Sequence, residues 1–397
     1  MVGTLLRSRR SEHHAQVTSV ELFFDLVFVI AVTQISHALV EHLTWLGALE
    51  AALLLLAIWW AWIDTAWITN WLDPEKPPVR LMLFVLMGIG LVMSSSLPEA
   101  FGDRGLAFAI AFAVFQLGRT AFMLWAVRGR PTLHRNFIRI IIWYAASAAL
   151  WVMGGLVDGE ARLVCWLIAV ALDSVSPALG FWVPGLGRAD TRDWDVDGGH
   201  MAERSGLFVM IALGESILVT GVGFTDLAWT SDVVLAMTVS LLQSIAMWWI
   251  FFAQHAEAAS AAISTSPDPG RVARQAYTYV PILLVGGIVV SAVGDEIVLA
   301  HPMGHLEPAT VLVLIGGPAL FLLGAALFKL AVFGRWSLPR FGGLLLVLAL
   351  YPFTAVLSPL LLSSLTTGIV VLVAAWETVE LARHPEHWPR ASRHHPE

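Results

Sequence analysis

Charge is scarce in this sequence. Of its 397 residues, 13% are charged and 57% are hydrophobic, and the mean hydropathy is +0.74. Soluble domains carry about 25% charged residues. This deficit excludes an ordinary soluble protein, because the apolar excess falls in blocks of membrane-spanning length. The sequence therefore predicts an all-α, polytopic integral membrane helical bundle that lies in a lipid bilayer.

Cysteine is almost absent as well. Cys165 is the single one, which excludes an intramolecular disulfide framework and a CxxC metal site. We expect Cys165 to be a small buried hydrophobe. HExxH, Walker and GxSxG motifs do not occur in the sequence. We therefore expect neither an enzyme nor a resident metal or cofactor.

A concentrated basic patch is missing too. The basic residues lie in short, separate loops, which excludes a nucleic-acid-binding footprint. The opening stretch, MVGTLLRSRRSEHHAQ, lacks the small-residue cleavage site of a secretory signal. We therefore expect the first apolar span to be retained in the protein.

Long apolar runs take the place of these features. The first is VELFFDLVFVIAVTQISH, from Val20 to His37, and a helix needs about 20 such residues to cross a bilayer. Only Ser358-Pro359 separates the last two runs, so a single re-entrant segment is the alternative there. Splitting the runs at Pro, Gly and charge clusters predicts twelve spans, near 20–40, 46–70, 80–97, 105–127, 137–157, 161–181, 202–223, 233–254, 276–299, 309–333, 342–357 and 360–381.

The positions of Lys and Arg test this count, because both favour cytoplasmic loops. With the N-terminus inside, the basic residues fall on the inner side of the twelve spans, apart from Arg104 and Arg162 outside and Arg119 within a span. A wrong number of spans would place basic residues on both sides of the membrane. The pattern therefore predicts twelve crossings with both termini cytoplasmic.

A polar stretch divides the chain into two halves. It reads PGLGRADTRDWDVDGGH, from Pro184 to His200, with the turn residues and mixed charges of a solvated loop. We therefore expect a cytoplasmic tail over 1–19, a first transmembrane half over 20–183, a cytoplasmic loop over 184–200, a second transmembrane half over 201–382 and a cytoplasmic tail over 383–397.

The two halves resemble each other faintly. LVFVIAVTQ from Leu26 is similar to LFVMIALGE, which begins 181 residues later at Leu207. The Trp59-Trp60 pair recurs 189 residues later as Trp248-Trp249. Similar offsets in successive spans indicate an internal repeat of six plus six spans, with chance likeness between apolar helices as the alternative.

Ionisable groups within the first half are candidates for function, because charge is costly in a bilayer. Glu21 and Asp25 stand four residues apart and share a helix face, with Glu21 at the boundary where it can simply face water. Asp64 and Arg119 lie at a depth comparable to that of Asp25. Two hypotheses stay open, a buried ion-pair cluster and a proton or ion pathway. Arg119 could pair with either aspartate or with Asp173.

The seventh span carries a second group of candidates. His200, Arg204 and Glu215 fall on one stripe, since four and eleven residues return a helix to nearly the same face, whereas Glu203 points elsewhere. Near the bilayer midplane the Glu215 carboxyl should favour its neutral form. It could carry a proton, or simply donate a hydrogen bond to a neighbouring helix backbone. Gln34 is its counterpart in the first repeat, which predicts a Gln34/Glu215 pair at mid-membrane.

Weaker signals are assigned to ordinary roles. Asp295 and Glu296 approach the outer end of their span and should be wet. His255 and Glu257 stand near the inner end of a span and are expected at the interface rather than on a metal. Two glycine pairs are expected to be helix packing surfaces, Gly286-Gly287 and Gly316-Gly317.

Several of these segments together resemble the bacterial low temperature requirement protein A (LtrA) family. The likeness rests on VELFFDLVFVIAVTQISH, on WWAWIDTAWITNWLD followed by Arg80, and on HMAERSGLFVMIALGESI, and it extends from about Val20 to His384. The resemblance implies a multi-pass protein of the bacterial cytoplasmic (inner) membrane, with no catalytic residues to carry over. The family's motif residues coincide with six candidates: Glu21, Asp25, His200, Glu203, Arg204 and Glu215.

Two classes of function follow from these features. The first is a transporter-like bundle for a small solute, coupled to protons, with Asp25, Asp64 and Arg119 as an inner gate and Glu215 as the central titrating group. The alternative is a membrane sensor or accessory protein that supports the envelope in the cold. That role would need a protein partner, or a homo-oligomer, because no loop is long enough for a soluble output domain. A lipid-modifying enzyme ranks third, since the sequence shows no convincing nucleophile or metal cluster.

Overall fold

The computed structural model describes residues 5–7, 16–191, 194, 196–225, 227–252 and 268–383. Over these ranges the chain is helical, and β structure is limited to two isolated bridges, Leu6–Leu72 and Val183–Gly187. The prediction of an all-α membrane bundle is confirmed.

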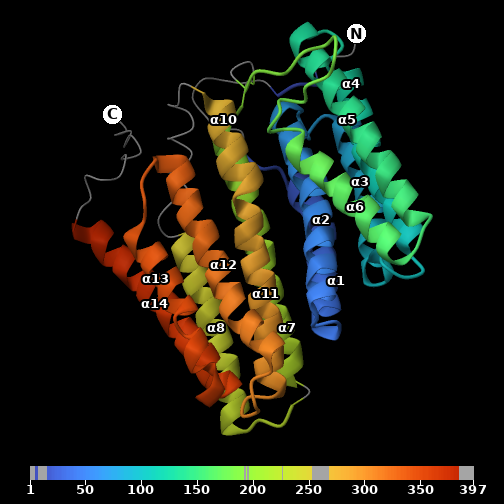
Figure 1. The fold of residues 1–397 in the computed structure, drawn as a ribbon. Coiled ribbons are helices and arrows are strands. Elements are labelled where there is room, and N and C mark those ends of the chain that lie inside the picture. The colour runs from blue at the N-terminus through green and yellow to red at the C-terminus, as the bar shows by residue number, and fades with distance from the viewer. Residues whose placement is uncertain are drawn as a thin grey trace. The chain divides into compact units, whose positions relative to one another are not determined.

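The chain divides into two compact units, coloured from blue to green and from green to red in Figure 1. The first comprises Met1–Met201 with Asp268–Arg271, and the second comprises Ala202–Pro267 with Val272–Glu397. The first unit contains α1 Ser19–Glu41, α2 Trp45–Trp71, α3 Pro77–Ser96, α4 Gly105–Ala126, α5 Pro131–Gly155 and α6 Gly159–Val175. The second contains most of α7 Gly198–Thr225, then α8 Ser231–Phe252, α11 Pro281–Ala300, α12 Pro308–Phe333, α13 Leu338–Leu348 and α14 Pro359–Arg383. Four short pieces complete the helical part of the described residues. A 3-10 helix Leu97–Glu99 follows α3, α10 Pro269–Ala273 and a π-helical turn Arg274–Tyr279 precede α11, and a 3-10 helix Tyr351–Val356 follows α13.

Local sequence signals set the helix ends. α1 begins with a capping box, in which the Glu21 amide donates to Thr18 Oγ1 at 3.4 Å and the Thr18 amide donates to Glu21 Oε2 at 2.9 Å. Proline stands in the first turn of α3, α5, α11 and α12, where its missing N–H costs no helical hydrogen bond. α12 ends at Gly334, whose φ of 64° lies in the left-handed region that glycine adopts without strain.

The outer faces of the helices are apolar. In α3, Leu81, Val85 and Val92 are 64%, 55% and 55% exposed, while Leu83 and Leu86 are buried against the neighbouring helices. Helices that are apolar on both faces suit a lipid environment. Among the described residues, ten helices are long and apolar enough to cross a membrane.

Two of the twelve expected spans form shorter helices. α6 has 17 residues, and α13 has 11, which spans only about 16 Å. The chain after α12 nevertheless runs to the other end of the second unit. The Leu360 amide at the start of α14 donates to Pro302 O before α12 at 3.0 Å, whereas Arg340 in α13 pairs with Glu377 near the end of α14. α13 and the 3-10 helix therefore lead the chain from one end of the second unit to the other, which is the path that two final spans would take.

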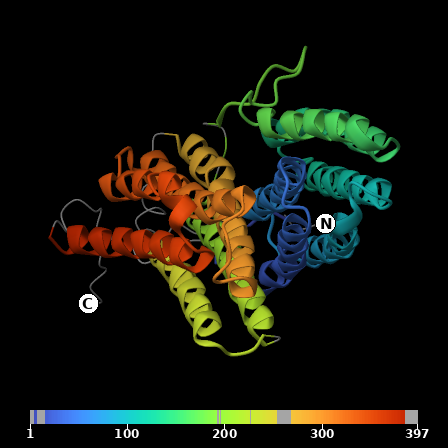
Figure 2. The ribbon, with the colours of Figure 1, turned by 60° about the horizontal axis from the view of Figure 1, so that its bottom comes forward.

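The two units share a pattern of helix neighbours. When the six spans of each unit are counted in order, the second packs on the fourth and sixth, the third on the fourth, and the fifth on the fourth and sixth, in both units. Figure 2 shows the helices of each unit lying alongside one another from a second direction. These shared neighbours are the ones that an internal repeat of six plus six spans predicts. The packing of α8 on α11 and of α12 on α14 has no counterpart of similar extent among the described residues of the first unit.

Candidate functional site

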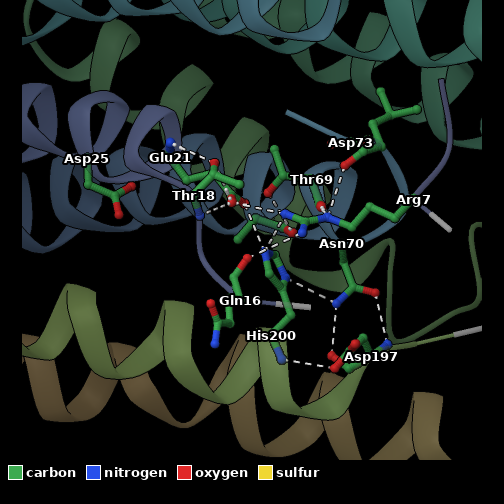
Figure 3. A network of polar contacts seen from close by, with 12 residues as sticks. Arg7, Gln16, Thr18, Glu21, Asp25, Thr69, Asn70, Asp73, Asp197 and His200 are labelled. Carbon is green, nitrogen blue, oxygen red and sulfur yellow. Dashed lines mark hydrogen bonds and ion pairs between the residues drawn. The ribbon is translucent and has the colours of Figure 1, made fainter. Parts of the chain in front are cut away.

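Polar side chains join the start of α1, the end of α2 and the first turn of α7 (Figure 3). We call Arg7, Glu21, Asn70, Asp197 and His200 the inner-end network, since they lie at the predicted cytoplasmic end. Glu21 Oε2 accepts a hydrogen bond from Arg7 Nη2 at 3.0 Å, and Glu21 Oε1 lies 2.8 Å from His200 Nε2. The expectation that Glu21 simply faces water is wrong, because these partners bury its side chain completely.

The N-terminal segment positions Arg7. Its main chain pairs with the residues after α2, since the Arg7 amide donates to Trp71 O at 2.9 Å and the Asp73 amide donates to Leu5 O at 2.9 Å. Arg7 Nε also donates to Thr69 O at 2.8 Å. The guanidinium is therefore fixed beside Glu21 by backbone contacts. Sequence reasoning missed Arg7 as a site residue and counted it as a loop charge.

Asn70 links the backbone of Asp197 to the ring of His200. Asn70 Oδ1 accepts from the Asp197 amide at 3.0 Å, which fixes the orientation of the side-chain amide. Asn70 Nδ2 then donates to Asp197 O at 2.9 Å and faces His200 Nδ1 at 3.2 Å. His200 Nε2 lies 2.8 Å from Glu21 Oε1 and 3.2 Å from Arg7 Nη2. The network thus joins the first turn of α7 to the carboxyl that Arg7 also contacts, an arrangement that anchors helix ends.

A second cluster lies among α2, α4 and α5. Asp64 Oδ2 accepts from Arg119 Nη2 at 3.1 Å and from the Tyr144 hydroxyl at 2.6 Å. This contact answers the question of the arginine's partner in favour of Asp64. Tyr144 was missed by sequence reasoning, because its distance along the chain gives no signal. The fully buried guanidinium donates to three further oxygens, Ala61 O at 2.7 Å, Thr65 Oγ1 at 3.1 Å and Gln116 Oε1.

Two more buried carboxyls of the first unit accept hydrogen bonds from tryptophan. Asp25 Oδ1 accepts from Trp62 Nε1 at 2.8 Å, and Asp173 Oδ2 accepts from Trp151 Nε1 at 3.2 Å. Trp62 of α2 and Trp151 of α5 therefore supply indole N–H donors to the interior of the first unit. Of the predicted inner gate, Asp64 and Arg119 are in direct contact.

The candidates on α7 show the predicted stripe. His200, Arg204 and Glu215 are buried, whereas Glu203 is exposed. Gln34, on α1, is half-buried. The predicted Gln34/Glu215 pair stays a prediction. The histidine and glutamate at positions 255 and 257 lie outside the described residues.

Asp295 occupies an interior site of the second unit. It is 1% exposed, so the expectation of a wet position is wrong. The reason is packing, since α8, α12 and α14 surround α11. Ser216 Oγ lies 3.5 Å from Asp295 Oδ2 and 3.2 Å from Ser244 Oγ.

Glu377, near the end of α14, carries the densest ion pairing among the described residues of the second unit. Arg340 donates to it twice, from Nε to Oε1 and from Nη2 to Oε2, both at 2.9 Å. Lys329 Nζ and Ser337 Oγ donate to Oε1 at 3.1 and 2.9 Å. A carboxylate with so many donors is compensated for its burial. Sequence reasoning missed this site, because it assigned both cations to cytoplasmic loops.

Within the described ranges, no group of three or more His, Cys, Asp or Glu side chains is placed to hold a metal ion. The polar clusters described above consist of ion pairs, indole donors and hydroxyls.

Comparison with known proteins identifies the family. The model of the bacterial low temperature requirement A protein (LtrA) matches residues 16–375. The chain belongs to the LtrA family. It is also similar to an uncharacterised protein of Rhizobium meliloti (strain 1021), with 38% identity over 362 residues, which cover 91% of this chain and 88% of that protein. No solved structure matches the chain. The matched LtrA range includes both Glu21 and His200 of the inner-end network and all of the Asp64 cluster.

Proposed function

We propose that this LtrA-family chain is a transporter of a small solute, driven by protons, in the cytoplasmic membrane of a bacterium. The observation that carries the proposal is the repeated six-span unit with a buried acid inside each copy. Parallel repeats of this kind build many secondary transporters. The proposal assigns movement of a solute, with no reaction chemistry.

The interior acids divide into two kinds, which supports the proposal. Glu21, Asp64 and Glu377 each contact an arginine. Among the described residues, the side-chain partners of Asp173 and Asp295 are neutral. A carboxyl without a counter-ion in a dry interior favours binding a proton or a cation over standing charged. If the interior acids served only in structural ion pairs, each buried carboxyl would be expected to contact an arginine or a lysine.

Roles follow from burial and contact. The Asp64–Arg119 pair, held by Tyr144, is the proposed inner gate, with Asp25 one turn inside α1. Glu215 is the proposed proton-binding group, because it is buried in the middle of an apolar helix. The inner-end network of Arg7, Glu21 and His200 fixes the helix ends around which the gate moves.

The test is solute-driven proton movement in liposomes that contain the purified protein and an internal pH dye. One gradient from a panel of amino acids, sugars and organic acids should produce a pH change. Glu215→Gln should abolish it while keeping the elution profile of the folded protein. Glu160→Gln is the matched control, because Glu160 is an exposed acid in the first turn of α6, remote from every cluster described above.

Full coupling in Glu215→Gln would remove Glu215 from the pathway. The absence of flux with every solute, together with a protein that co-purifies stably, would replace the proposal with the sensor or accessory role.

A further inference from the structure

Four buried oxygens converge inside the second unit from three different helices. Asp295 comes from α11, Ser216 from α7, and Ser240 and Ser244 from α8. Ser216 Oγ lies 3.5 Å from Asp295 Oδ2 and 3.2 Å from Ser244 Oγ. The hydroxyl of Ser240 donates to Ala236 O at 3.1 Å and also interacts with the Asp295 carboxyl. All four residues are at least nine-tenths buried. We call them the α7–α8–α11 oxygen cluster.

The contacts between these oxygens are long for O–H···O hydrogen bonds. A hydroxyl that donates to a carboxylate lies about 2.5–2.7 Å from it, well below the separation between Ser216 and Asp295. Oxygens that share a cation at right angles stand apart by √2 times the metal–oxygen distance. Separations of 3.2 and 3.5 Å thus correspond to a metal–oxygen distance of about 2.3–2.5 Å.

That distance and the charge of the cluster select the ion. Ca²⁺, which has nearly the radius of Na⁺, binds oxygens at about 2.3–2.6 Å, whereas Mg²⁺ requires about 2.0–2.1 Å. The cluster holds one carboxyl and three neutral hydroxyls, so a monovalent cation balances its charge and a divalent cation leaves an excess. K⁺ is a larger ion and needs a longer metal–oxygen distance than these oxygen separations give.

The other interior acids with defined partners do not offer this chemistry. Asp173 has one neighbouring hydroxyl, that of Ser147, and it also faces the N–H donor of Trp151, whose positive end repels a cation. Glu377 is already neutralised by Arg340 and Lys329. Asp64 is neutralised by Arg119. Among these, Asp295 alone combines a buried carboxyl, neutral partners and three neighbouring hydroxyl oxygens.

We propose that the α7–α8–α11 oxygen cluster is a sodium-binding site, with Asp295 as its charged ligand and Ser216, Ser240 and Ser244 as neutral ligands. The site stands independently of the proposed function, because an LtrA protein that moves no solute can still bind the ion.

The experiment measures binding, not flux. The purified full chain in detergent is heated while NaCl replaces choline chloride or KCl at constant ionic strength, and equilibrium binding of ²²Na⁺ is measured in parallel. Sodium should raise the unfolding temperature saturably, because a ligand that binds the folded state stabilises it by mass action. Choline and potassium should not, and lower pH should weaken the effect by competition of protons for Asp295.

Variants locate the site. Asp295→Asn, which keeps the shape and removes the charge, should abolish both the temperature shift and the ²²Na⁺ signal. Ser216→Ala and Ser244→Ala should each weaken the apparent affinity roughly tenfold, and they keep the test decisive if the aspartate variant fails to fold. Asp173→Asn is the matched control, and should keep the full sodium response.

Three results would overturn the proposal: equal unfolding temperatures in sodium and choline, an equal response to sodium and potassium, or a sodium response that survives in Asp295→Asn. Sodium binding without any solute flux would leave the site standing and would count against the transport proposal alone.

Discussion

Trp60 and Trp249 stand 189 residues apart and make the same hydrogen bond, each within its own unit. Trp60 Nε1 of α2 donates to Ser174 Oγ of α6 at 3.0 Å, and Trp249 Nε1 of α8 donates to Thr378 Oγ1 of α14 at 2.9 Å. Both bonds join the second span of a unit to its sixth. This shared bond supports a duplicated six-span unit.

The residue before each acceptor is also equivalent. Asp173 precedes Ser174, and Glu377 precedes Thr378, and both acids are buried. Their partners have diverged. Asp173 accepts from an indole, whereas Glu377 holds Arg340 and Lys329. The sixth span of each unit therefore carries an interior acid whose environment differs between the two copies.

The two tryptophan bonds should differ in strength. Trp60 is 2% exposed, whereas Trp249 is 42% exposed. Trp60→Phe should lower the free energy of unfolding by about 1–2 kcal/mol, because it removes a buried donor and leaves the Ser174 hydroxyl without it. Trp249→Phe should cost less than about 0.5 kcal/mol. Denaturant unfolding in detergent measures both, and equal losses would contradict the role of burial.

Arg7 and Glu21 should be strongly coupled. Glu21→Gln should destabilise the protein by about 3–5 kcal/mol, because it leaves the guanidinium of Arg7 beside a neutral group in a buried site. The double variant with Arg7→Met should lose less than the sum of the single variants. A double-mutant cycle on unfolding free energies measures this coupling. Strict additivity would show that the pair is not coupled.

Arg119→Lys should be poorly tolerated. The guanidinium donates to Asp64, to Thr65, to the backbone of Ala61 and to Gln116, and an ammonium cannot reach four acceptors in this fork geometry. We expect a loss of about 2–4 kcal/mol in the free energy of unfolding. Arg128→Lys is the control, because Arg128 is exposed and its side chain donates to one backbone carbonyl. Similar unfolding temperatures for the two variants would contradict the assigned role.

Two adjacent glycines of α12 should respond oppositely to alanine. A Cβ at Gly317 would lie 2.7 Å from the backbone nitrogen of Ser291 in α11, whereas a Cβ at Gly316 would meet open space. Gly317→Ala should separate α11 from α12 and cost more than about 2 kcal/mol. Gly316→Ala should be neutral or stabilise the helix by up to about 1 kcal/mol. Thermal unfolding of both variants checks this, and equal behaviour would contradict close packing at Gly317.

Composition and apolar periodicity by themselves determined the fold class of this LtrA protein. Low charge and runs of about 20 apolar residues require helices, because an unpaired backbone group is too costly in lipid. The order of the apolar helices along the chain could also be predicted from the sequence, whereas the six-plus-six repeat stays a prediction. The stripe of Arg204 and Glu215 followed from the helical period alone, which is a local property.

The partners of the charged groups were decided by the tertiary structure. Nothing in the sequence joins Arg7 to Glu21 and His200, Asp64 to Tyr144, or Arg340 to Glu377, because helices far apart in the chain meet through packing. Asp295 shows the same limit, since its distance from the end of its span predicted exposure, whereas the helices around α11 bury it. The position of a residue along its span can be obtained from the sequence of that one helix. Burial and ion pairing depend on which helices lie beside it, and only the assembled unit sets those neighbours.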